Sequence, residues 1–437
     1  MPFSTTDTIV AIATPPGRGG IGVVRLSGAD ACRIARSMIS YGDSLEPRRA
    51  TLTRVGAHGG VAPIDQVVVT YFPAPHSYTG DDVVEVSAHG SPVILSAIVQ
   101  SAIVGGARLA EPGEFTLRAF LNGRIDLPQA EAVADLIDAV TPLQARAAFD
   151  QLEGTLTRAI AEIDAALFDL IARLEASVDF PDEGYHFVEP HRVVSAIDEV
   201  VTRTSALLES AAQGRLVREG LQVAIVGKPN VGKSSLFNAL AGAPRAIVTE
   251  VPGTTRDFVT EVVDIEGMSV TLIDTAGLRD TTDRVEAEGV LRARQTLAVS
   301  DLALVVVDED EPENLSAKHF VVQNKFDLGR PRRGVCVSAA TGFGLDALRR
   351  AIVEALNDAP LRDRPAITNL RHIALVERAH EALLRARQAA SADGGSLSEE
   401  FVLADLQDAR AALEEITGRR ASDELLARIF SRFCIGK

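Results

Sequence analysis

The feature that most constrains the fold of this chain is the segment GKPNVGKS at residues 227–234, which matches G-x-x-x-x-G-K-[ST]. Loops of this pattern wrap a phosphate with backbone N–H groups, helped by the positive end of the following helix. The apolar run 221–226 predicts a buried strand before the loop, and residues 235–240 predict a helix after it. The chain is therefore predicted to contain a P-loop α/β domain that binds a nucleoside phosphate. The predicted phosphate contacts are Asn230, Val231, Gly232, Lys233, Ser234 and Ser235, with Lys233 reaching the β and γ phosphates and Ser234 ligating Mg²⁺.

A second motif identifies the base. Asn324-Lys325-Phe326-Asp327 follows another apolar run and precedes Val337-Ser338-Ala339. A carboxylate in the plane of guanine accepts hydrogen bonds from the ring N–H and the exocyclic amine, whereas adenine offers no such pair of donors. Asp327 is therefore predicted to select GTP. The predicted contacts in these loops are Asn324, Lys325, Asp327, Ser338 and Ala339.

A third motif, Asp274-Thr275-Ala276-Gly277, ends a strand predicted at 270–273. Asp274 is predicted to hold Mg²⁺, directly or through water, and the Gly277 N–H to sense the γ-phosphate. The runs 302–307 and 320–323 predict neighbouring parallel strands joined by a short connection. Since the motifs occur in the order typical of guanine-nucleotide hydrolases, the sequence predicts a Ras-like GTPase domain.

The residue after Gly277 is Leu278, where small signalling GTPases carry the glutamine that orients the attacking water. Leucine cannot orient water, so hydrolysis is either very slow or depends on another group. Three acids follow, Asp280, Asp283 and Glu286, and each is either that group or part of a solvated acidic loop.

Length and composition limit the number of domains, the cellular compartment and the kinds of partner that this chain can have. With 437 residues, 46% of them hydrophobic, the chain is expected to form more than one domain. No apolar run approaches the ~18 residues of a membrane span, and the first residues lack the pattern of a signal peptide. Cys32, Cys336 and Cys434 have no metal-ligand spacing, so a cytoplasmic protein without membrane contact is expected. The net charge of −16 restricts RNA contact to a local basic patch or a second protein.

The predicted secondary structure changes along the chain. The predicted parts are an α+β domain at 1–124, a first helical part at 125–217, the inserted G domain at 218–358 and a second helical part at 359–437. Neither helical part is expected to form a sufficient hydrophobic core alone, so one helical bundle interrupted by the G domain is the simplest arrangement. Two separate helical modules are the alternative. The fold class is thus multidomain α/β.

Local signals place several elements within these parts. Asp126 suits the N-cap of a helix with Pro128 in its first turn. Apolar residues recur at three- and four-residue steps over 152–174, which predicts an amphipathic helix ending near residue 180. A second helix is predicted over 193–208. Short strands are predicted at 21–26, 66–71 and 82–86.

Five segments together carry a family resemblance. They are DTIVA at 7–11, TPPGRGG at 14–20, GTTRD at 253–257, DTAGLR at 274–279 and FCIGK at 433–437. In this order along the whole chain, they resemble the bacterial family of tRNA-modification GTPases called MnmE or TrmE, which acts on the wobble uridine. The combination of the C-terminal CIGK with an internal P-loop is highly specific.

The resemblance implies functions that composition does not. In this family the N-terminal α+β domain binds a folate one-carbon donor, 5-formyl- or methylene-tetrahydrofolate, and forms a homodimer. The G domains dimerise through their nucleotide faces, where K⁺ stimulates hydrolysis. With an FAD-containing partner subunit, the hetero-oligomer builds an aminomethyl-type substituent at C5 of uridine 34 in tRNA. The alternative is a ribosome-assembly or regulatory GTPase, which would need an RNA-binding module such as a basic GxxG element, and the sequence shows none.

Carried onto this chain, the resemblance assigns the cations and the water of the nucleotide site. It implies as K⁺ ligands Asn230, Thr249, Val251 and Thr254, whose oxygen atoms suit a hard cation. K⁺ beside the β–γ bridge would neutralise developing charge, as an arginine finger does elsewhere. Thr255 would complete Mg²⁺ coordination with Ser234, and both Thr249 and Thr255 would contact GTP. Glu286 matches the water-orienting glutamate, and Lys233 and Thr254 complete the implied catalytic set.

The resemblance also implies a folate site. The matching positions are Arg25, Glu85, Arg124 and Lys437. A pterin presents donors like those of guanine, so Glu85 could read it, while the basic residues suit the glutamate tail of the folate. Each basic residue is otherwise a surface charge. Cys434 is the candidate for the modification chemistry, and a thiol without a catalytic role is its alternative.

Overall fold

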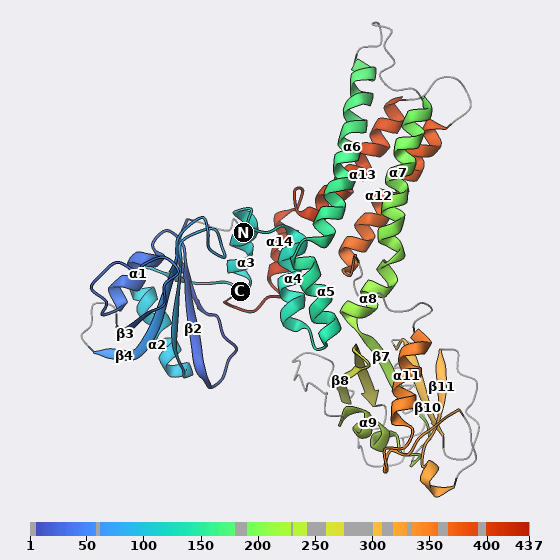
Figure 1. Cartoon of the computed structure of the whole chain (residues 1–437), viewed down its shortest axis with the longest axis horizontal. Coiled ribbons are helices and arrows are strands. Elements are labelled where there is room, and N and C mark those ends of the chain that lie inside the picture. The colour runs from blue at the N-terminus through green and yellow to red at the C-terminus, as the bar shows by residue number, and fades with distance from the viewer. Residues whose placement is uncertain are drawn as a thin grey trace. The chain divides into compact units, whose positions relative to one another are not determined.

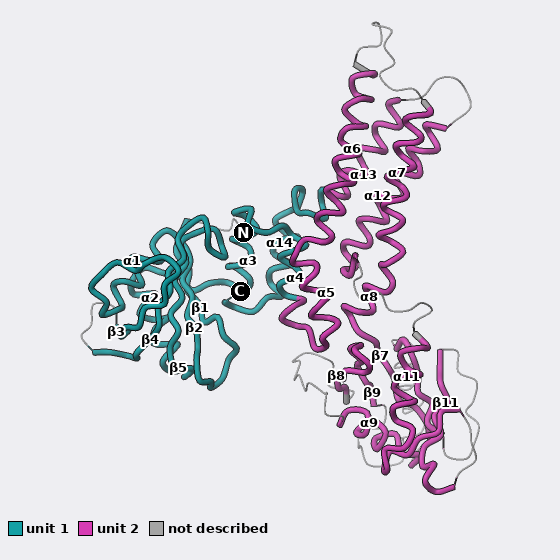
Figure 2. Tube along the Cα trace, viewed as in Figure 1, with its two compact units in different colours: residues 1–134, 414–437 teal, residues 135–413 magenta. Residues whose placement is uncertain are grey.

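The computed structural model describes residues 6–57, 62–179, 190–228, 230–242, 259–274, 300–307, 318–329, 334–356, 366–391 and 399–436. The chain forms two compact units (Figure 2). The first unit joins Met1–Ala134 with Glu414–Lys437, and the second contains Asp135–Leu413. Across the described segments, no helix combines enough length with enough apolar character to cross a lipid bilayer.

The first unit is built on a six-stranded sheet in the order β3-β4-β5-β2-β1-β6 (Figure 1). Its strands are β1 (Ile9–Ile12), β2 (Gly19–Ser27), β3 (Thr51–Gly56), β4 (Pro63–Phe72), β5 (Val83–Gly90) and β6 (Arg108–Leu109). The pairing is antiparallel except between β1 and β6. The strands predicted at 21–26, 66–71 and 82–86 are confirmed within β2, β4 and β5.

Two helices, α1 (Ala31–Met38) and α2 (Pro92–Val104), cover one face of this sheet. The apolar residues of β2 and β5 that pack beneath these helices alternate along each strand: they are Val24, Leu26, Val84 and Val86. Because side chains alternate between the two faces of a strand, Arg25 and Glu85 lie on the opposite face.

The opposite face carries α3 (Glu114–Leu121), whose Phe115 is buried against Ile9 and Ala11 of β1. The start of α4 (Leu127–Asp138) and α14 (Asp423–Phe430) extend this layer. The shared apolar cluster consists of Leu117, Leu127, Ala130, Leu426, Phe430 and Phe433.

Asp126 is the N-cap of α4, as predicted, with Pro128 in the first turn. The Gln129 N–H donates to Asp126 Oδ1 at 2.9 Å, and the Asp126 N–H donates to Gln129 Oε1 at 3.0 Å. This reciprocal pair is a capping box and satisfies two backbone donors at the end of the helix.

The helices of the second unit that lie outside the G domain form one bundle. They are α5 (Pro142–Leu152), α6 (Thr155–Asp179), α7 (Pro190–Glu209), α8 (Ala211–Glu219), α12 (Leu370–Ala390) and α13 (Glu399–Thr417), the last of which continues into the first unit. The predicted helices at 152–174 and 193–208 are confirmed as α6 and α7, except that Leu152 ends α5 and α6 begins at Thr155. Since α12 packs along α7, helical segments from both sides of the G domain share one core, as the predicted fold class requires. At this contact Thr204 Oγ1 lies 2.8 Å from His380 Nδ1.

The G domain contains a six-stranded sheet in the order β12-β11-β10-β7-β9-β8. Its elements are β7 (Leu221–Val226), α9 (Lys233–Ala241), β8 (Val259–Ile265), β9 (Met268–Asp274), β10 (Leu302–Val307), β11 (His319–Gln323), the short helix η2 (Phe326–Leu328), β12 (Val335–Cys336) and α11 (Leu345–Leu356). All pairs are parallel except β8 with β9. The predicted pairing of β10 with β11 is confirmed; most of their connection, 308–317, lies outside the described residues.

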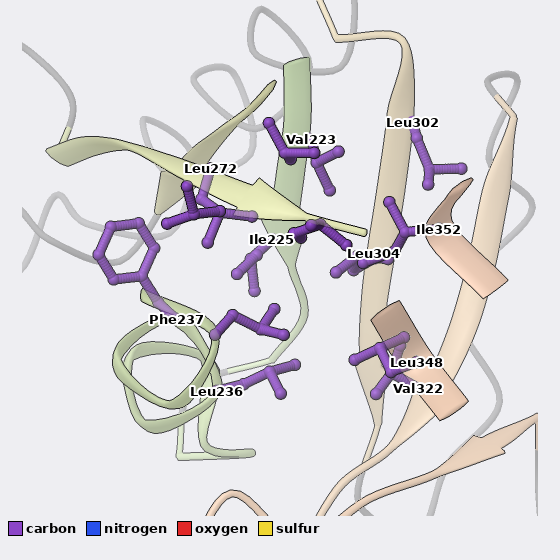
Figure 3. Close-up of a cluster of buried hydrophobic side chains, with 14 of the residues drawn as sticks. Val223, Ile225, Leu236, Phe237, Leu272, Leu302, Leu304, Val322, Leu348 and Ile352 are labelled. Carbon is purple, nitrogen blue, oxygen red and sulfur yellow. The ribbon is translucent and has the colours of Figure 1, made fainter. Parts of the chain in front are cut away.

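Both faces of this sheet are apolar at its centre. Figure 3 shows the face covered by α9 and α11, where Leu236, Phe237, Leu348 and Ile352 approach the strands. The strand residues beneath them are Val223, Ile225, Leu272, Leu302, Leu304 and Val322. A second cluster of alternate residues, such as Ala224 and Val305, lies on the other face. This burial fixes the strand ends from which the site loops emerge.

Candidate functional site

The predicted nucleotide residues gather at one edge of the G-domain sheet. The P-loop follows β7, Asp274 ends β9, Asn324 follows β11 and Ser338 follows β12. These four strands run parallel, so their carboxyl ends meet at the same edge. Open α/β sheets bind their ligands at this edge.

The side chain of Asn324 ties three loops together. Its Nδ2 donates to the carbonyls of Val231 and Gly232 at 3.1 and 3.4 Å, and its Oδ1 accepts from the Ala339 N–H at 3.1 Å. The residue is only 2% exposed. Gly232 has a φ of +96°, and a Cβ there would lie 2.3 Å from Asn324 Nδ2. Sequence reasoning placed Asn324 in the base site and missed this link to the P-loop.

The side chain of Lys233 is held inside the P-loop by backbone carbonyls of the loop. Its Nζ donates to the carbonyls of Gly227 and Lys228, both at 2.9 Å. Burial lowers the pKa of the ammonium group, and the negative charge of Asp274 partly opposes this effect. A phosphate in the loop would favour the charged ammonium far more than two carbonyls do. The loop therefore holds a cation in place for an anionic ligand.

Oxygen donors lie around the start of α9. Ser234 and Ser235 are exposed in its first turn, and Asp274, at the end of β9, is only 4% exposed. A hydroxyl and a carboxylate are ligands of the kind that Mg²⁺ prefers. Asn230 has a left-handed backbone, and its carbonyl accepts from Lys325 Nζ at 2.8 Å, which joins the P-loop to the base-binding segment.

The base-binding loops are held by backbone hydrogen bonds. The Phe326 N–H donates to the Val337 carbonyl at 3.1 Å, and the Ser338 N–H donates to the Phe343 carbonyl at 2.9 Å. Asp327 is exposed on η2, so its carboxylate is accessible to a base. Ser338 is fully buried.

The other residues predicted for the nucleotide site lie outside the described residues, and their assignments stay predictions. They are Thr249, Val251, Thr254, Thr255, Gly277, Leu278, Asp280, Asp283 and Glu286.

In the first unit, the structure brings Arg25 and Glu85 together. They are register partners on β2 and β5, and Arg25 Nε donates to Glu85 Oε1 at 2.9 Å. Their side chains are 22% and 29% exposed, so the ion pair is half-buried and accessible to a ligand. The guanidinium also lies over the rings of Tyr78 and Phe115, at 5.4 and 5.7 Å from their centroids.

Sequence reasoning missed the aromatic residues of this site. The Tyr78 hydroxyl lies 2.8 Å from Thr116 Oγ1, and burial raises the pKa of this tyrosine. Arg124 is exposed and lies against the loop that carries Tyr78, since a Cβ added to Gly80 would lie 3.3 Å from Arg124 Cγ. Strand alternation predicts the face on which Arg25 lies, whereas no local pattern indicates which loop covers it.

The C-terminal tail docks on the same unit. The Gly113 N–H donates to the Cys434 carbonyl at 3.3 Å, and Ile435 forms a β-bridge with Pro112. Gly436 has a φ of +99°, and a Cβ there would lie 2.2 Å from the carbonyl oxygen of Ile12. Gly436 thus lies beside the end of β1, the strand that pairs with the one that carries Arg25. Cys434 is exposed and Lys437 lies outside the described residues.

Two family models cover nearly the whole chain. Residues 8–124 match the N-terminus of the GTP-binding protein TrmE, and residues 127–434 match the MnmE helical domain. The tRNA modification GTPase MnmE of Koribacter versatilis is 45% identical, with 99% of each chain covered. The enzyme of the same description from Nitrosospira multiformis is 43% identical, with 100% of each chain covered.

Among solved structures, the G domain of the T. maritima FeoB iron transporter is 29% identical over 31% of this chain and 99% of its own. The TM-score is 0.24, and so low a value supports no statement about the fold.

Proposed function

The chain belongs to the MnmE family of tRNA modification GTPases, and we propose that it is the GTP-hydrolysing subunit that modifies C5 of the wobble uridine, U34, with an aminomethyl-type group. The observation that carries this proposal is 45% identity to a curated relative over 99% of both chains. Membership favours this reaction over a ribosome-assembly or regulatory switch. As a GTPase, the protein binds GTP.

In the G domain, Asp327 reads guanine and Lys233 holds the β and γ phosphates. Ser234 and Thr255 would ligate Mg²⁺, and Asp274 would hold it directly or through water. The buried Asp274 carboxylate and the exposed Ser234 hydroxyl support this assignment, because both are hard oxygen donors at the phosphate end of the loop. When bound, Mg²⁺ supplies positive charge to the phosphate oxygens.

We assign the K⁺ site to Asn230, Thr249, Val251 and Thr254. Asn230 is exposed in the P-loop, so its side-chain oxygen is accessible to a cation, which supports its part in this set. Two G domains of a homodimer would close over this face and bring Glu286 to the attacking water. Exchange of K⁺ for Na⁺ at matched ionic strength is expected to slow GTP turnover, because the smaller Na⁺ fits the same oxygen cage poorly. Equal turnover in the two salts would remove K⁺ from the proposal.

The folate site is assigned to the half-buried pair of Arg25 and Glu85. Glu85 is the acceptor for the amino and ring N–H donors of a pterin, and it can serve only if its bond to Arg25 is shared or opened. The basic residues then suit the glutamate tail: they are Arg25, Arg124 and Lys437. The docked tail brings Cys434 onto the same unit, which supports a role near the one-carbon donor.

The proposed partners are a second copy of this chain, an FAD-dependent subunit and tRNA. A chain with a net charge of −16 is a poor general binder of RNA, so a partner subunit is the simplest source of tRNA affinity. We place the reaction in the cytoplasm, where tRNA matures, and the three free cysteines fit that setting. The proposed domain limits are 1–124, 125–217, 218–358 and 359–437.

The test is mass spectrometry of tRNA nucleosides from cells that lack this protein. Loss of C5-substituted wobble uridines is expected, with full return on complementation by the wild-type chain and a smaller return with Glu85→Ala. An unchanged nucleoside profile in the deletion strain would refute the proposed reaction.

A further inference from the structure

We propose that the stacked rings of Phe326 and Phe343 are a positioning device that holds the two base-recognition loops together before nucleotide binds. The inference rests on the proposed guanine site and adds two residues to it. Phe326 stands between Lys325 and Asp327 in the segment that reads the base, and Phe343 closes the loop that begins at Ser338.

The geometry of the pair is that of an offset aromatic stack. The ring centroids are 5.4 Å apart and the planes differ by 14°. Backbone bonds then fix each ring to its loop: the Phe326 N–H donates to the Val337 carbonyl, and the Phe343 carbonyl accepts from the Ser338 N–H. The stack therefore links the segment of Asp327 directly to the loop of Ser338 and Ala339.

The pair is not part of the folding core. Phe343 is 56% exposed, and neither ring belongs to the buried cluster of Figure 3. Phe326 is half-buried, and such a partly exposed aromatic pair contributes little to global stability but restricts the loops that carry it. The loop of Phe343 has further bonds of its own, since the Thr341 N–H donates to Ser338 Oγ at 3.2 Å.

The consequence is preorganisation of the base site and not of the phosphate site. Asn324 holds the P-loop through Val231 and Gly232, and that link does not involve the rings. Without the stack, the loops of Asp327 and Ala339 keep only the bond of Asn324 to the Ala339 N–H and that of the Phe326 N–H to the Val337 carbonyl. The order that the stack supplied must then be gained when guanine binds, and its cost appears as faster dissociation. Hydrolysis at saturating GTP depends on the phosphate site and is retained.

The experiment compares full-length variants by equilibrium titration and stopped-flow release of fluorescent GDP. F343A is expected to weaken binding and speed release by about threefold to tenfold, the range of an aromatic pair. KM for GTP rises by the same factor while kcat is kept. F343Y, which keeps a ring, restores affinity, and F326A combined with F343A loses no more than either alone because the rings act as a unit.

The matched control is F401A, which removes a phenylalanine that is 70% exposed on α13 in the helical bundle and should leave binding unchanged. Thermal unfolding reports the folded fraction of each variant, and F343L replaces F343A if the latter does not fold. Unchanged GDP release in F343A, or a loss in F343Y as large as in F343A, overturns the inference. If D327N weakens binding and F343A does not, the guanine site stands and only the stack fails; if D327N also binds normally, the guanine site itself is wrong.

Discussion

The proposed nucleotide site at the carboxyl ends of the G-domain strands and the proposed folate site on one face of the N-terminal sheet are built by different means. The nucleotide site lies at the carboxyl ends of parallel strands. There, each loop is a short continuous segment that presents backbone groups to a ligand. The second lies on the face of an antiparallel sheet, where Arg25 and Glu85 meet across two strands. A site at strand ends is organised by loop-to-loop links such as Asn324, whereas a site on a face depends on register.

This difference predicts that the two sites can be damaged independently. A substitution at the strand ends should alter nucleotide chemistry and leave folate binding intact, and a substitution on the face should do the reverse. A single substitution that impaired both GTP hydrolysis and folate binding would contradict this independence.

The largest effect is expected for Glu286→Ala. Leu278 cannot align water, so loss of the water-orienting group should lower kcat for GTP by about 10²- to 10³-fold. Nucleotide affinity should barely change, because the interaction forms mainly in the transition state. Single-turnover hydrolysis beside equilibrium binding of a GTP analogue separates these effects. A near-normal rate would transfer the role to Asp280 or Asp283, which the same assay tests.

Asp327→Asn should weaken GTP binding by about 1.5–3 kcal/mol, because an amide donor replaces the carboxylate that accepts from guanine. The same change should improve binding of xanthosine triphosphate, whose C2 carbonyl accepts from the new amide. Calorimetric titration with both nucleotides measures the exchange of preference. GTP affinity equal to that of the wild type would contradict the assignment of Asp327.

On the sheet face, Glu85→Ala and Arg25→Ala should each weaken reduced-folate binding by about 1–2 kcal/mol. The effect is smaller than at Asp327 because Arg25 and Glu85 already bind each other, and the ligand must share or open that ion pair, which offsets part of the binding free energy. Folate titration measures it, with GTP turnover as the internal control. Arg25→Lys keeps the charge but not the planar fork, so recovery by this variant would show that charge alone suffices.

The smallest effect concerns stability and neither ligand. Asp126→Ala removes the capping box of α4 and should lower the free energy of unfolding by about 1 kcal/mol. Denaturant unfolding of the first unit measures the loss, and Asp126→Asn, which keeps an acceptor, should recover most of it. If neither substitution changes the free energy of unfolding, the packing of α4 on α14, and not the cap, determines the stability of this helix.

The sequence predicts more of the strand-end site than of the face site. Lys233, Ser234, Asn324 and Asp327 follow buried strands, and their relative placement comes from the order of motifs alone. Arg25 and Glu85 were found through a family resemblance, and neither their mutual ion pair nor the cover by Tyr78 and Phe115 was predicted. Register between strands 60 residues apart is a tertiary property, and local patterns do not carry it.

Helices show the same division between local and distant information. Periodicity predicts α6 and α7 to within a few residues, and the Asp126 cap is a local signal. The docking of the tail through Gly436 has no local signal, because it needs the carbonyl of Ile12 to approach a residue without a Cβ. The stack of Phe326 on Phe343 is likewise a contact between two loops.

The division of the first unit between Met1–Ala134 and Glu414–Lys437 has a consequence for synthesis. Helix α14 covers Leu117 and Ala130, yet it emerges only after the whole second unit has been made. At about 5–20 residues per second, the interval between Ala134 and Glu414 lasts roughly 15 to 55 s. During that interval the apolar residues of α3 and α4 that α14 later covers are exposed on the nascent chain. Cells must therefore keep this exposed apolar surface from aggregating each time the protein is made.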